Sequence, residues 1–570
     1  MQWNDLTLSL NIEGTLSVTP VSRYAVRIDA AWEEITCEKP ELTFVWETPL
    51  VDIHFAWHPA CGKNRSMRVD WMGDISSRIT SSAPVFTFFS NTGRSRMTVA
   101  LSDALTLIGQ NYGVREENGM LHCRVTVPLD ATGKTHSYSV MLYRDYDDQP
   151  YEDAIRRVSV WWENDCGYVP MHVPELARLP LYSTWYSYHQ QAYAADLEAE
   201  CALAAEDGYK TVIVDDGWQT DDNSRGYGYC GDWQNAPGKI PDMRAHVEKI
   251  QNMGMKYMLW YNVAFIGKHA AHFDEFKDML LVPVNHHNAG TLDPRFPKVR
   301  DFIINTYVTA LKEWNLDGFK LDFIDSFVSS SEAPAPREGM DYVKVEDAVL
   351  RLMQDVMHAL QAIKPDILIE FRQSYIGPAM RTFGNMFRVG DCPADLLSNR
   401  VGMVDLRLLS GNTAVHADML MWHKDETLEN AAWQILNILF CVPQISVRLA
   451  EVPASHRKML RFWMDFISKH HELLAAPIYA DSPELLYPRV HTRLGDEEAV
   501  AIYQANYLHE LSDVPTTYLF NASGSEGLLV KGEGQAVLFN CLGEAADTVS
   551  LTGDYQLLPI PKSGFATITK

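Results

Sequence analysis

The feature that most constrains the fold is an alternation of short apolar segments and amphipathic segments between about residues 178 and 475. Each apolar segment ends in polar or charged residues, and the amphipathic stretches have the 3.6-residue period of a helix. The expected strands are residues 181–185, 211–215, 256–261, 318–322, 367–371, 386–390, 415–421 and 444–448. The expected helices are residues 194–207, 243–252, 297–314, 345–363, 428–440 and 455–474.

Eight strand–helix repeats in sequence predict a (β/α)8 TIM barrel, whose strands are buried on both faces and therefore read as apolar runs. The alternative is a doubly wound parallel sheet, which carries a glycine-rich phosphate-binding turn after its first strand. Residues 181–185 read Leu-Tyr-Ser-Thr-Trp and have no such glycines. The pattern therefore favours the barrel.

Two β-rich segments flank the predicted barrel, so we expect an α/β fold with a β-domain at each end. Short β-branched and aromatic runs, broken by turn residues, fill the first 165 residues, and no long helical period is visible there. The same pattern returns after about residue 480. We expect an N-terminal β-sandwich over residues 1–170, the catalytic barrel over 171–478 and a small C-terminal β-sandwich over 479–570.

The charge balance excludes several classes of partner. The 570 residues include 49 basic and 74 acidic side chains, and the formal net charge of −25 repels nucleic acids and anionic membranes. No apolar stretch is long enough to span a membrane, and no signal peptide is visible. Nine scattered cysteines without a C-x-x-C pair are typical of a reducing compartment. We therefore expect a cytoplasmic protein with a small-molecule substrate and no nucleic-acid or membrane partner; homo-oligomer formation is left open.

Polar and aromatic residues gather at the predicted strand ends. The carboxyl ends of the strands form the active-site face of a TIM barrel. The residues expected there are Trp185, Asp215, Asp216, Trp218, Trp260, Lys320, Asp322, Glu370, Arg372, Arg388, Asp391 and Trp422. Carboxylates and lysine bind vicinal hydroxyl groups, while aromatic rings cover the C–H faces of a sugar. The mixture indicates a site for a hydroxyl-rich ligand.

Two segments contain the candidate acids. Lys320 and Asp322 project to the same side of one strand, and the ammonium group keeps the carboxylate ionised, as a nucleophile requires; an ion pair that closes the barrel is an equally good reading. Asp391 and Asp395 follow Arg388 in a loop, where Asp395 could instead cap the next helix. Asp322 and Asp391 are therefore a candidate pair for glycoside hydrolysis, expected about 5–6 Å apart.

Several segments resemble the α-galactosidases of glycoside hydrolase family 36 and their relatives in family 27. They are Val214-Asp-Asp-Gly-Trp218, Gly231-Asp-Trp233, Lys239-Ile-Pro241, Gly254-Met-Lys-Tyr-Met-Leu-Trp260, Lys320-Leu-Asp322 and Arg388-Val-Gly-Asp391. They occur in the family's order between about residues 180 and 395, and the family's three-domain plan fits the whole length. The resemblance implies a retaining, exo-acting α-glycosidase, above all an α-galactosidase, that needs no metal or cofactor.

The resemblance also implies a role for each matched residue. Asp322 would be the nucleophile, and Asp391 the general acid/base, with Asp395 as the second choice. The other matched residues would bind the sugar: Asp215 and Asp216 at the 4- and 6-hydroxyls, Lys320 at a ring hydroxyl, Arg388 on the 2-hydroxyl side, and Trp185, Trp218 and Trp260 around the ring.

Two positions depart from the family pattern. The fifth strand ends in Ile369-Glu-Phe-Arg-Gln-Ser-Tyr375 where the family has a Cys/Ser/Gly-rich stretch, so Arg372 could reshape the 2-position pocket or bind an anionic sugar. Gly390 replaces the family's serine before the acid, which keeps Asp395 as an alternative. The alternative functions are an α-N-acetylgalactosaminidase, an α-glycosidase for an acidic or modified sugar, a transglycosylase related to raffinose synthases, and a carbohydrate-binding relative without turnover.

Overall fold

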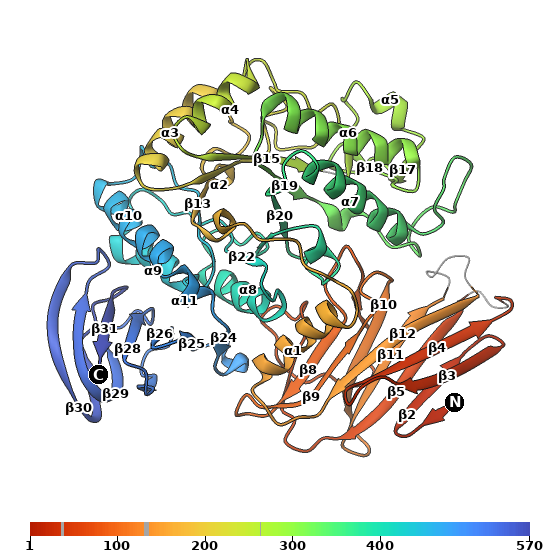
Figure 1. Cartoon of the computed structure of the whole chain (residues 1–570), viewed down its shortest axis with the longest axis horizontal. Coiled ribbons are helices and arrows are strands. Elements are labelled where there is room, and N and C mark those ends of the chain that lie inside the picture. The colour runs from red at the N-terminus through yellow and green to blue at the C-terminus, as the bar shows by residue number, and fades with distance from the viewer. Residues whose placement is uncertain (36–38, 130–135, 263) are drawn as a thin grey trace.

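Figure 1 shows the computed structural model of the protein, which describes residues 1–35, 39–129, 136–262 and 264–570. A central α/β barrel, coloured yellow to light blue, carries a red and orange β-rich part and a blue β-rich part. The eight cysteines in the described ranges are free thiols, and Cys37 lies outside those ranges. No helix in the described ranges combines the length and apolarity that crossing a membrane requires.

The central sheet confirms the predicted (β/α)8 barrel. Its eight strands are parallel and follow one another around the barrel in chain order. They are β13 (Leu181–Ser183), β14 (Thr211–Val214), β15 (Lys256–Asn262), β19 (Gly318–Asp322), β20 (Leu368–Arg372), β21 (Met386–Arg388), β22 (Ala414–His416) and β23 (Gln444–Ile445). The first strand pairs with the last, and an isolated bridge joins His416 to Val442, so the sheet is nearly closed.

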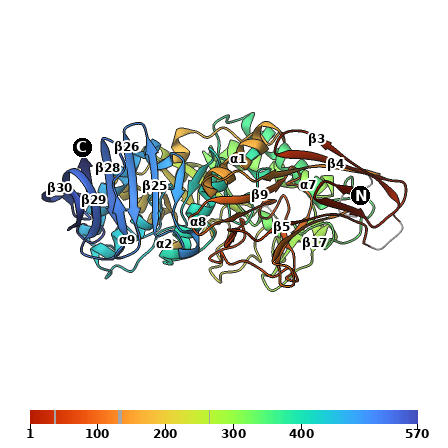
Figure 2. The ribbon, with the colours of Figure 1, turned by 90° about the horizontal axis from the view of Figure 1, so that it is seen from below.

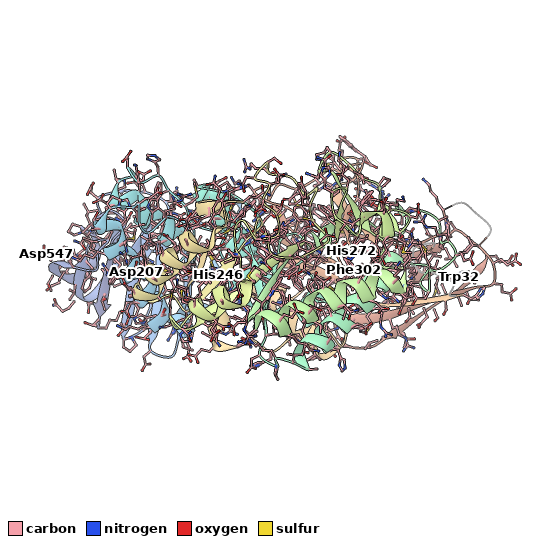
Figure 3. The ribbon with its side chains drawn as sticks, turned by 90° about the horizontal axis from the view of Figure 1, so that it is seen from above. Trp32, Asp207, His246, His272, Phe302 and Asp547 are labelled. Carbon is pink, nitrogen blue, oxygen red and sulfur yellow. The ribbon has the colours of Figure 1, made fainter. Side chains whose placement is uncertain are left out.

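The predicted helices surround this sheet. They are α3 (Ala194–Glu206), α4 (Met243–Gln251), α6 (Pro297–Trp314), α7 (Val345–Gln361) and α9 (Leu428–Asn437), and the last predicted helix is divided into α10 (Ala454–Lys469) and α11 (His471–Ala475). Asp207, labelled in Figure 3, directly follows α3. Arg457 of α10 donates hydrogen bonds to both of its carboxylate oxygens. This contact joins the helices that follow the last and first barrel strands. Three short strands, β16 (Phe265–Gly267), β17 (Leu280–Val282) and β18 (Ala289–Leu292), and the turn α5 (Phe273–Phe276) are inserted after β15.

Two helices were not among the expected ranges. The helix α8 (Leu396–Leu409) lies between β21 and β22; the sequence offered Asp395 as the cap of a helix here, but the nearly continuous buried apolar residues hide the helical period. The helix α1 (Tyr151–Asn164) falls in the region where no helix was predicted. Its apolar face, which includes Ile155, Val158 and Trp162, packs against the sandwich and α8. That prediction was wrong because β-branched and aromatic residues, which favour strands, also form the buried face of a helix here.

In its described residues, the N-terminal part contains two antiparallel sheets of six strands each, as expected for a β-sandwich. The first has the order β1 (Gln2–Trp3), β2 (Leu6–Leu10), β5 (Glu41–Pro49), β11 (Met120–Pro128), β10 (Ile108–Arg115) and β7 (Ile75–Ser77). The second has the order β3 (Gly14–Pro20), β4 (Ala25–Trp32), β12 (Ser137–Asp145), β9 (Ser95–Leu101), β8 (Val85–Phe89) and β6 (Phe55–Trp57). Apolar residues from both sheets, among them Trp46 and Phe86, form one buried core.

The C-terminal part is also β-structure. Hydrogen bonds join all its strands in one sheet: β24 (Ile478–Ala480), β25 (Arg489–Leu494), β26 (Glu497–Ile502), β27 (Leu508–Glu510), β28 (Thr516–Asn521), β29 (Leu528–Phe539), β30 (Ala545–Leu558) and β31 (Phe565–Thr569). Figure 2 shows this sheet and the N-terminal sandwich at opposite ends of the molecule. The domain boundaries at residues 170 and 478 stay predictions.

A buried polar cluster links the three parts of the chain. Arg65, in a loop of the N-terminal part, lies 3.0 Å from Asp405 of α8, and both side chains are at most 6% exposed. The Tyr487 hydroxyl and the Trp57 indole N–H also donate to Asp405, at 2.6 and 2.9 Å. Asp405 therefore neutralises Arg65 and holds residues that are far apart in the sequence.

We predict that Asp405→Ala lowers the free energy of unfolding by about 3–5 kcal/mol, because it leaves Arg65 buried without a counter-charge. The matched control is Asp465→Ala, which removes an exposed ion pair with Lys469 on α10 and should cost no more than about 0.5 kcal/mol. Urea denaturation of the two variants measures both changes. Equal effects would contradict the importance of the buried cluster.

Candidate active site

The barrel register brings the predicted residues to one end of the sheet. Trp260 lies opposite Lys320, Lys320 lies opposite Glu370, and Arg372 lies opposite Arg388 on neighbouring strands. Residues paired in this way point to the same face of a sheet. The carboxyl ends of β15, β19, β20 and β21 therefore present an indole, an ammonium group, carboxylates and two guanidinium groups together.

Asp215 and Lys320 form a buried ion pair. The Lys320 ammonium nitrogen lies 2.6 Å from an oxygen of Asp215, and each side chain is at most 4% exposed. Burial alone would lower the pKa of Lys320, but the charges of Asp215, Asp322 and Glu370 outweigh it and raise that pKa. Lys320 is therefore a fixed positive charge at the centre of the strand ends.

Asp216 has a different environment from its neighbour. Gln190 and Gln219 each donate a side-chain hydrogen bond to its carboxylate, at 2.7 and 2.6 Å. Burial, helped by the charge of Asp215, raises the pKa of Asp216 to about 6. The next residue, Gly217, has φ 112°, and a Cβ there would lie 2.5 Å from the Gln190 backbone, so the Asp-Asp-Gly turn requires glycine.

Asp322 ends β19 and receives four hydrogen bonds. Arg372 Nε and the Phe323 backbone N–H donate to Oδ1 at 2.6 and 2.8 Å, and the Tyr375 hydroxyl, 3.3 Å from the same oxygen, shares its proton with the Leu321 carbonyl oxygen at 3.0 Å. The Trp260 indole N–H donates to Oδ2 at 3.1 Å. Burial favours the neutral acid, but Arg372, Lys320 and the Trp260 N–H outweigh it and hold the pKa of Asp322 well below its usual range. The carboxylate is therefore ionised at neutral pH.

Arg372 pairs with protein carboxylates. Besides Asp322, its guanidinium group lies 3.4 Å from an oxygen of Asp325, and it sits 5.2 and 5.4 Å from the centres of the Phe323 and Tyr375 rings. The guanidinium charge is thus neutralised within the protein. This arrangement argues against the expectation that Arg372 recognises an anionic sugar.

Arg388 holds the other candidate acid. One of its terminal nitrogens lies 2.8 Å from Asp391, and the other lies 2.5 Å from Asp418, which is fully buried. The Asp391 side chain is 55% exposed. The buried part of this side chain raises its pKa, but the positive charges of Arg388 and Lys320 outweigh that effect. The pKa of Asp391 therefore lies below its usual value. The negative charge of Asp322 acts in the opposite direction and raises the pKa of Asp391.

Asp395 has a structural role. It is the N-cap residue of α8, where its carboxylate accepts the backbone N–H of Ser398 at 2.9 Å. A second interaction is with Lys63, at 3.3 Å. The carboxylate is thus engaged with the helix end and the N-terminal part of the chain, which argues against Asp395 as the acid/base.

The three tryptophans have different surroundings. Trp260 is buried beside Asp322, as described, and Trp185 is partly exposed at the start of the helical turn α2 (Trp185–Tyr188), stacked on His189. Trp218 is fully buried, and its indole N–H donates to the Trp260 carbonyl oxygen. Trp218 packs among other aromatic rings, so it has no surface for a sugar, and its proposed binding role is not supported by its position.

Sequence reasoning missed Tyr227 at this site. Tyr227 lies in the loop after β14, its ring stacks on Trp260, and the carboxylates of Asp216 and Asp322 act on its hydroxyl. Its sequence context, Gly226-Tyr-Gly-Tyr-Cys230, reads only as a loop. Asp418 follows β22 and joins the site through its ion pair with Arg388.

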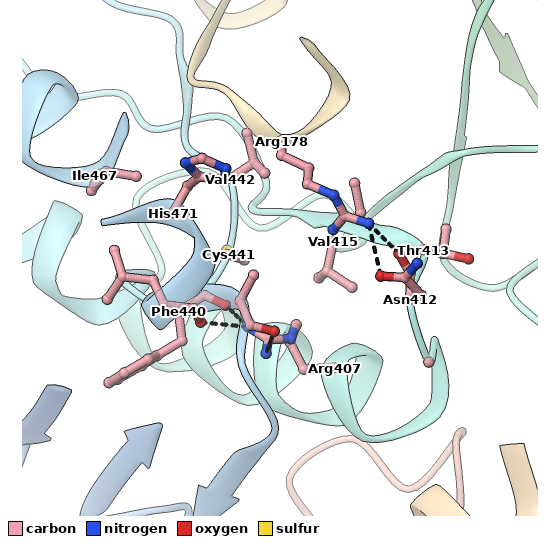
Figure 4. A pocket seen from close by; sticks show the side chains of 14 residues that line it. Arg178, Arg407, Asn412, Thr413, Val415, Phe440, Cys441, Val442, Ile467 and His471 are labelled. Atoms are coloured by element: carbon pink, nitrogen blue, oxygen red, sulfur yellow. Dashed lines mark hydrogen bonds between the residues drawn. The ribbon is translucent and has the colours of Figure 1, made fainter. Parts of the chain in front are cut away.

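A separate small cavity of about 50 Å³ lies at the opposite end of the barrel (Figure 4). Arg178, Asn412 and Cys441, which line it, precede the strands β13, β22 and β23. Arg407, also in its lining, donates to the backbone carbonyls of residues at the end of α11. This cavity contains none of the candidate residues.

We predict that Asp395→Ala lowers the free energy of unfolding by about 1 kcal/mol, because α8 loses its N-cap. The control Asp395→Ser keeps a capping oxygen and should change stability by only a few tenths of a kcal/mol. Both values come from urea denaturation. An Asp395→Ala protein of normal stability would contradict the capping role.

Part of the chain is similar in sequence to known proteins. The family model described as Melibiase matches residues 179–379. Alpha-galactosidase C of Emericella nidulans is 24% identical over 213 residues, which are 34% of this chain and only 26% of that protein. The chain thus matches about a quarter of the length of this curated relative.

Solved structures are similar over nearly the whole chain. The α-galactosidase of Lactobacillus brevis has a TM-score of 0.65 at 12% identity, covering 99% of this chain and 86% of that chain. The family 36 α-galactosidase AgaA of Geobacillus stearothermophilus has a TM-score of 0.64 at 14% identity, covering 99% and 81%. A variant of AgaA has been solved with raffinose, at a TM-score of 0.63, 14% identity and the same coverage. The chain therefore has the fold of the family 36 α-galactosidases, and its resemblance to them is confirmed over residues 179–379 by the Melibiase model.

Proposed function

We propose that the protein is a retaining, exo-acting α-galactosidase, which removes terminal α-galactosyl residues from small glycosides. The observation that carries the proposal is the ionised Asp322 at the end of β19, bound by Arg372, together with Asp391 bound by Arg388 in the loop after β21. The Melibiase match covers Asp322, and the AgaA complex with raffinose supports a galactoside as the substrate class.

In the first step, Asp322 attacks the anomeric carbon while Asp391 gives a proton to the glycosidic oxygen, and the aglycone leaves as an alcohol. This step requires a protonated Asp391. Arg388 opposes protonation in the free protein, whereas the negative charge of Asp322 favours it. A sugar that covers the half-exposed Asp391 excludes water and raises its pKa towards that of a general acid.

In the second step, water attacks the β-linked galactosyl ester of Asp322, and Asp391 takes the proton from the water. In the ester, Asp322 carries no charge and no longer favours protonation of Asp391. Arg388 then keeps Asp391 ionised, as a general base requires. Galactose leaves with its α-configuration retained, and Asp322 returns to the carboxylate. We propose that the two carboxyl groups lie about 5–6 Å apart across the sugar.

Buried polar residues support the binding of a neutral sugar. Asp215, Asp216 and Lys320 offer acceptors and donors for hydroxyl groups, and the partly exposed rings of Tyr227 and Trp185 are suited to its C–H faces. Trp260 is buried against Tyr227 and instead supports Asp322 through its indole N–H. The charge of Arg372 is already balanced by Asp322 and Asp325, so an acidic sugar would find no free cation there. A cytoplasmic location is part of this proposal.

A panel of aryl α-glycosides tests the proposal. We expect hydrolysis of the α-galactoside at least tenfold faster, in kcat/KM, than of the α-N-acetylgalactosaminide, the α-glucoside or an α-galacturonide, a difference of about 1.4 kcal/mol in transition-state binding. The product should be α-galactose by NMR. Binding of galactosides without turnover, or preference for another glycone, would contradict the proposal.

Two variants test the roles of the acids. Asp391→Ala should slow hydrolysis of an α-galactoside with a poor leaving group by about 10²–10⁴-fold, and Asp322→Ala should abolish it. Azide should yield an α-galactosyl azide with the Asp391 variant and a β-galactosyl azide with the Asp322 variant. The control is Asp395→Ala, which should keep full turnover. Retained activity in either acid variant would refute the role of that residue.

A further inference from the structure

The hydrogen bonds to Asp322 are distributed unequally between its two oxygens. Oδ1 accepts from Arg372 Nε and the Phe323 backbone N–H, at 2.6 and 2.8 Å, and the Tyr375 hydroxyl lies 3.3 Å from it. Among the described residues, Oδ2 accepts only from the Trp260 indole N–H, at 3.1 Å. Within the described part of the chain, Oδ1 is therefore the more heavily bonded oxygen, and Oδ2 keeps lone pairs for a substrate.

The strongest of these contacts comes from a residue that is itself held in place. Arg372 Nη1 donates to the Gln373 carbonyl oxygen at 2.8 Å, and the guanidinium group lies beside the rings of Phe323 and Tyr375. Its side chain is only 17% exposed. A charge-assisted hydrogen bond from such a fixed group restricts rotation of the carboxylate.

We propose that Arg372 is a positioning residue, which binds Oδ1 of Asp322 and thereby presents Oδ2 to the anomeric carbon. The inference rests on the proposed function, since it takes Asp322 as the nucleophile. It gives the arginine at the end of the fifth strand a role in turnover, in place of sugar recognition.

The hydrogen bond from Arg372 to Oδ1 of Asp322 acts in both steps of double displacement. When Oδ2 bonds to the anomeric carbon, Oδ1 becomes the carbonyl oxygen of the galactosyl ester and keeps its donors. When water attacks, the bond from Oδ2 to the sugar breaks, and the electron pair returns to the carboxylate. Arg372 and the Phe323 N–H then stabilise the negative charge that develops on the leaving carboxylate.

The test compares Arg372→Ala and Arg372→Lys with the wild-type protein on an aryl α-galactoside. We expect kcat to fall by about 10²–10³-fold in the alanine variant, with KM changed less than threefold, because the lost contact acts on the reacting carboxylate. Added guanidinium ion should restore part of kcat in the alanine variant. The lysine variant should remain well below wild type, because a lysine amine cannot donate with the planar geometry of a guanidinium group.

The pH profile supplies a second readout. Arg372 lowers the pKa of Asp322, and the reaction needs the ionised carboxylate. Without Arg372 that pKa rises, so the acid limb of kcat/KM should move to higher pH in the alanine variant. The matched control is Arg156→Ala, which removes a partly buried arginine paired with Asp153 on α1, outside the barrel. It should show neither loss of kcat, nor rescue, nor a shifted limb.

The outcomes separate this inference from the proposed function. A β-galactosyl azide from Asp322→Ala identifies the nucleophile whatever Arg372 does. Given that product, an Arg372→Ala variant with kcat within threefold of wild type overturns the positioning role. A folded Arg372→Ala variant whose loss is neither rescued by guanidinium nor accompanied by a shifted acid limb also overturns it. If no azide product forms and no galactoside is cleaved, the proposed function itself fails.

Discussion

A set of alternating buried charges occupies the carboxyl end of the barrel, and the rest of the site depends on it. Lys320 pairs with Asp215, while Arg388 contacts Asp418 and Asp391 and lies 3.6 Å from Glu370. Each of these charges can be buried only because an opposite charge lies beside it. The network therefore fixes the strand ends that carry Asp322 and Asp391, and it sets the electrostatic field in which both must react.

The N-terminal sandwich supports the same end of the barrel. The Thr80 hydroxyl donates to the Phe327 carbonyl oxygen, and the Ser82 N–H donates to the Ser374 carbonyl oxygen at 2.7 Å. Phe327 follows β19, and Ser374 follows β20, so the sandwich holds the loops beside Asp322 and Arg372. The flanking β-structure thus contributes to the placement of the reacting groups as well as to the size of the core.

Much of the barrel could be predicted because its strands and helices alternate in a regular pattern. The helix α6 has the predicted bounds of 297 and 314, since a proline begins it and Asn315 in the left-handed conformation ends it. The helix α1 could not be found in this way, because its buried residues are of types that favour strands. The Asp215–Lys320 pair illustrates the site: the sequence placed both residues at strand ends, but only the structure shows that they bind each other.

Contacts between distant segments explain why other site residues differ from what the sequence predicted. The sequence left Asp395 as either an acid/base or a helix cap, and the bond to Ser398 favours the cap. Trp218 belongs to a matched motif, yet the chain folds so that neighbouring aromatic rings cover it. Arg372 departed from the family pattern, and its balance by Asp322 and Asp325 depends on a loop conformation that the local sequence does not reveal.

Covalent trapping tests the central claim most directly. A fluorinated galactosyl fluoride that reacts quickly but hydrolyses slowly should leave one galactosyl group on the protein, and mass spectrometry of its peptides locates that group. The account predicts that the label is on Asp322. A label on Asp325, Asp391 or any other residue, or turnover of α-galactosides without a covalent adduct, would contradict it.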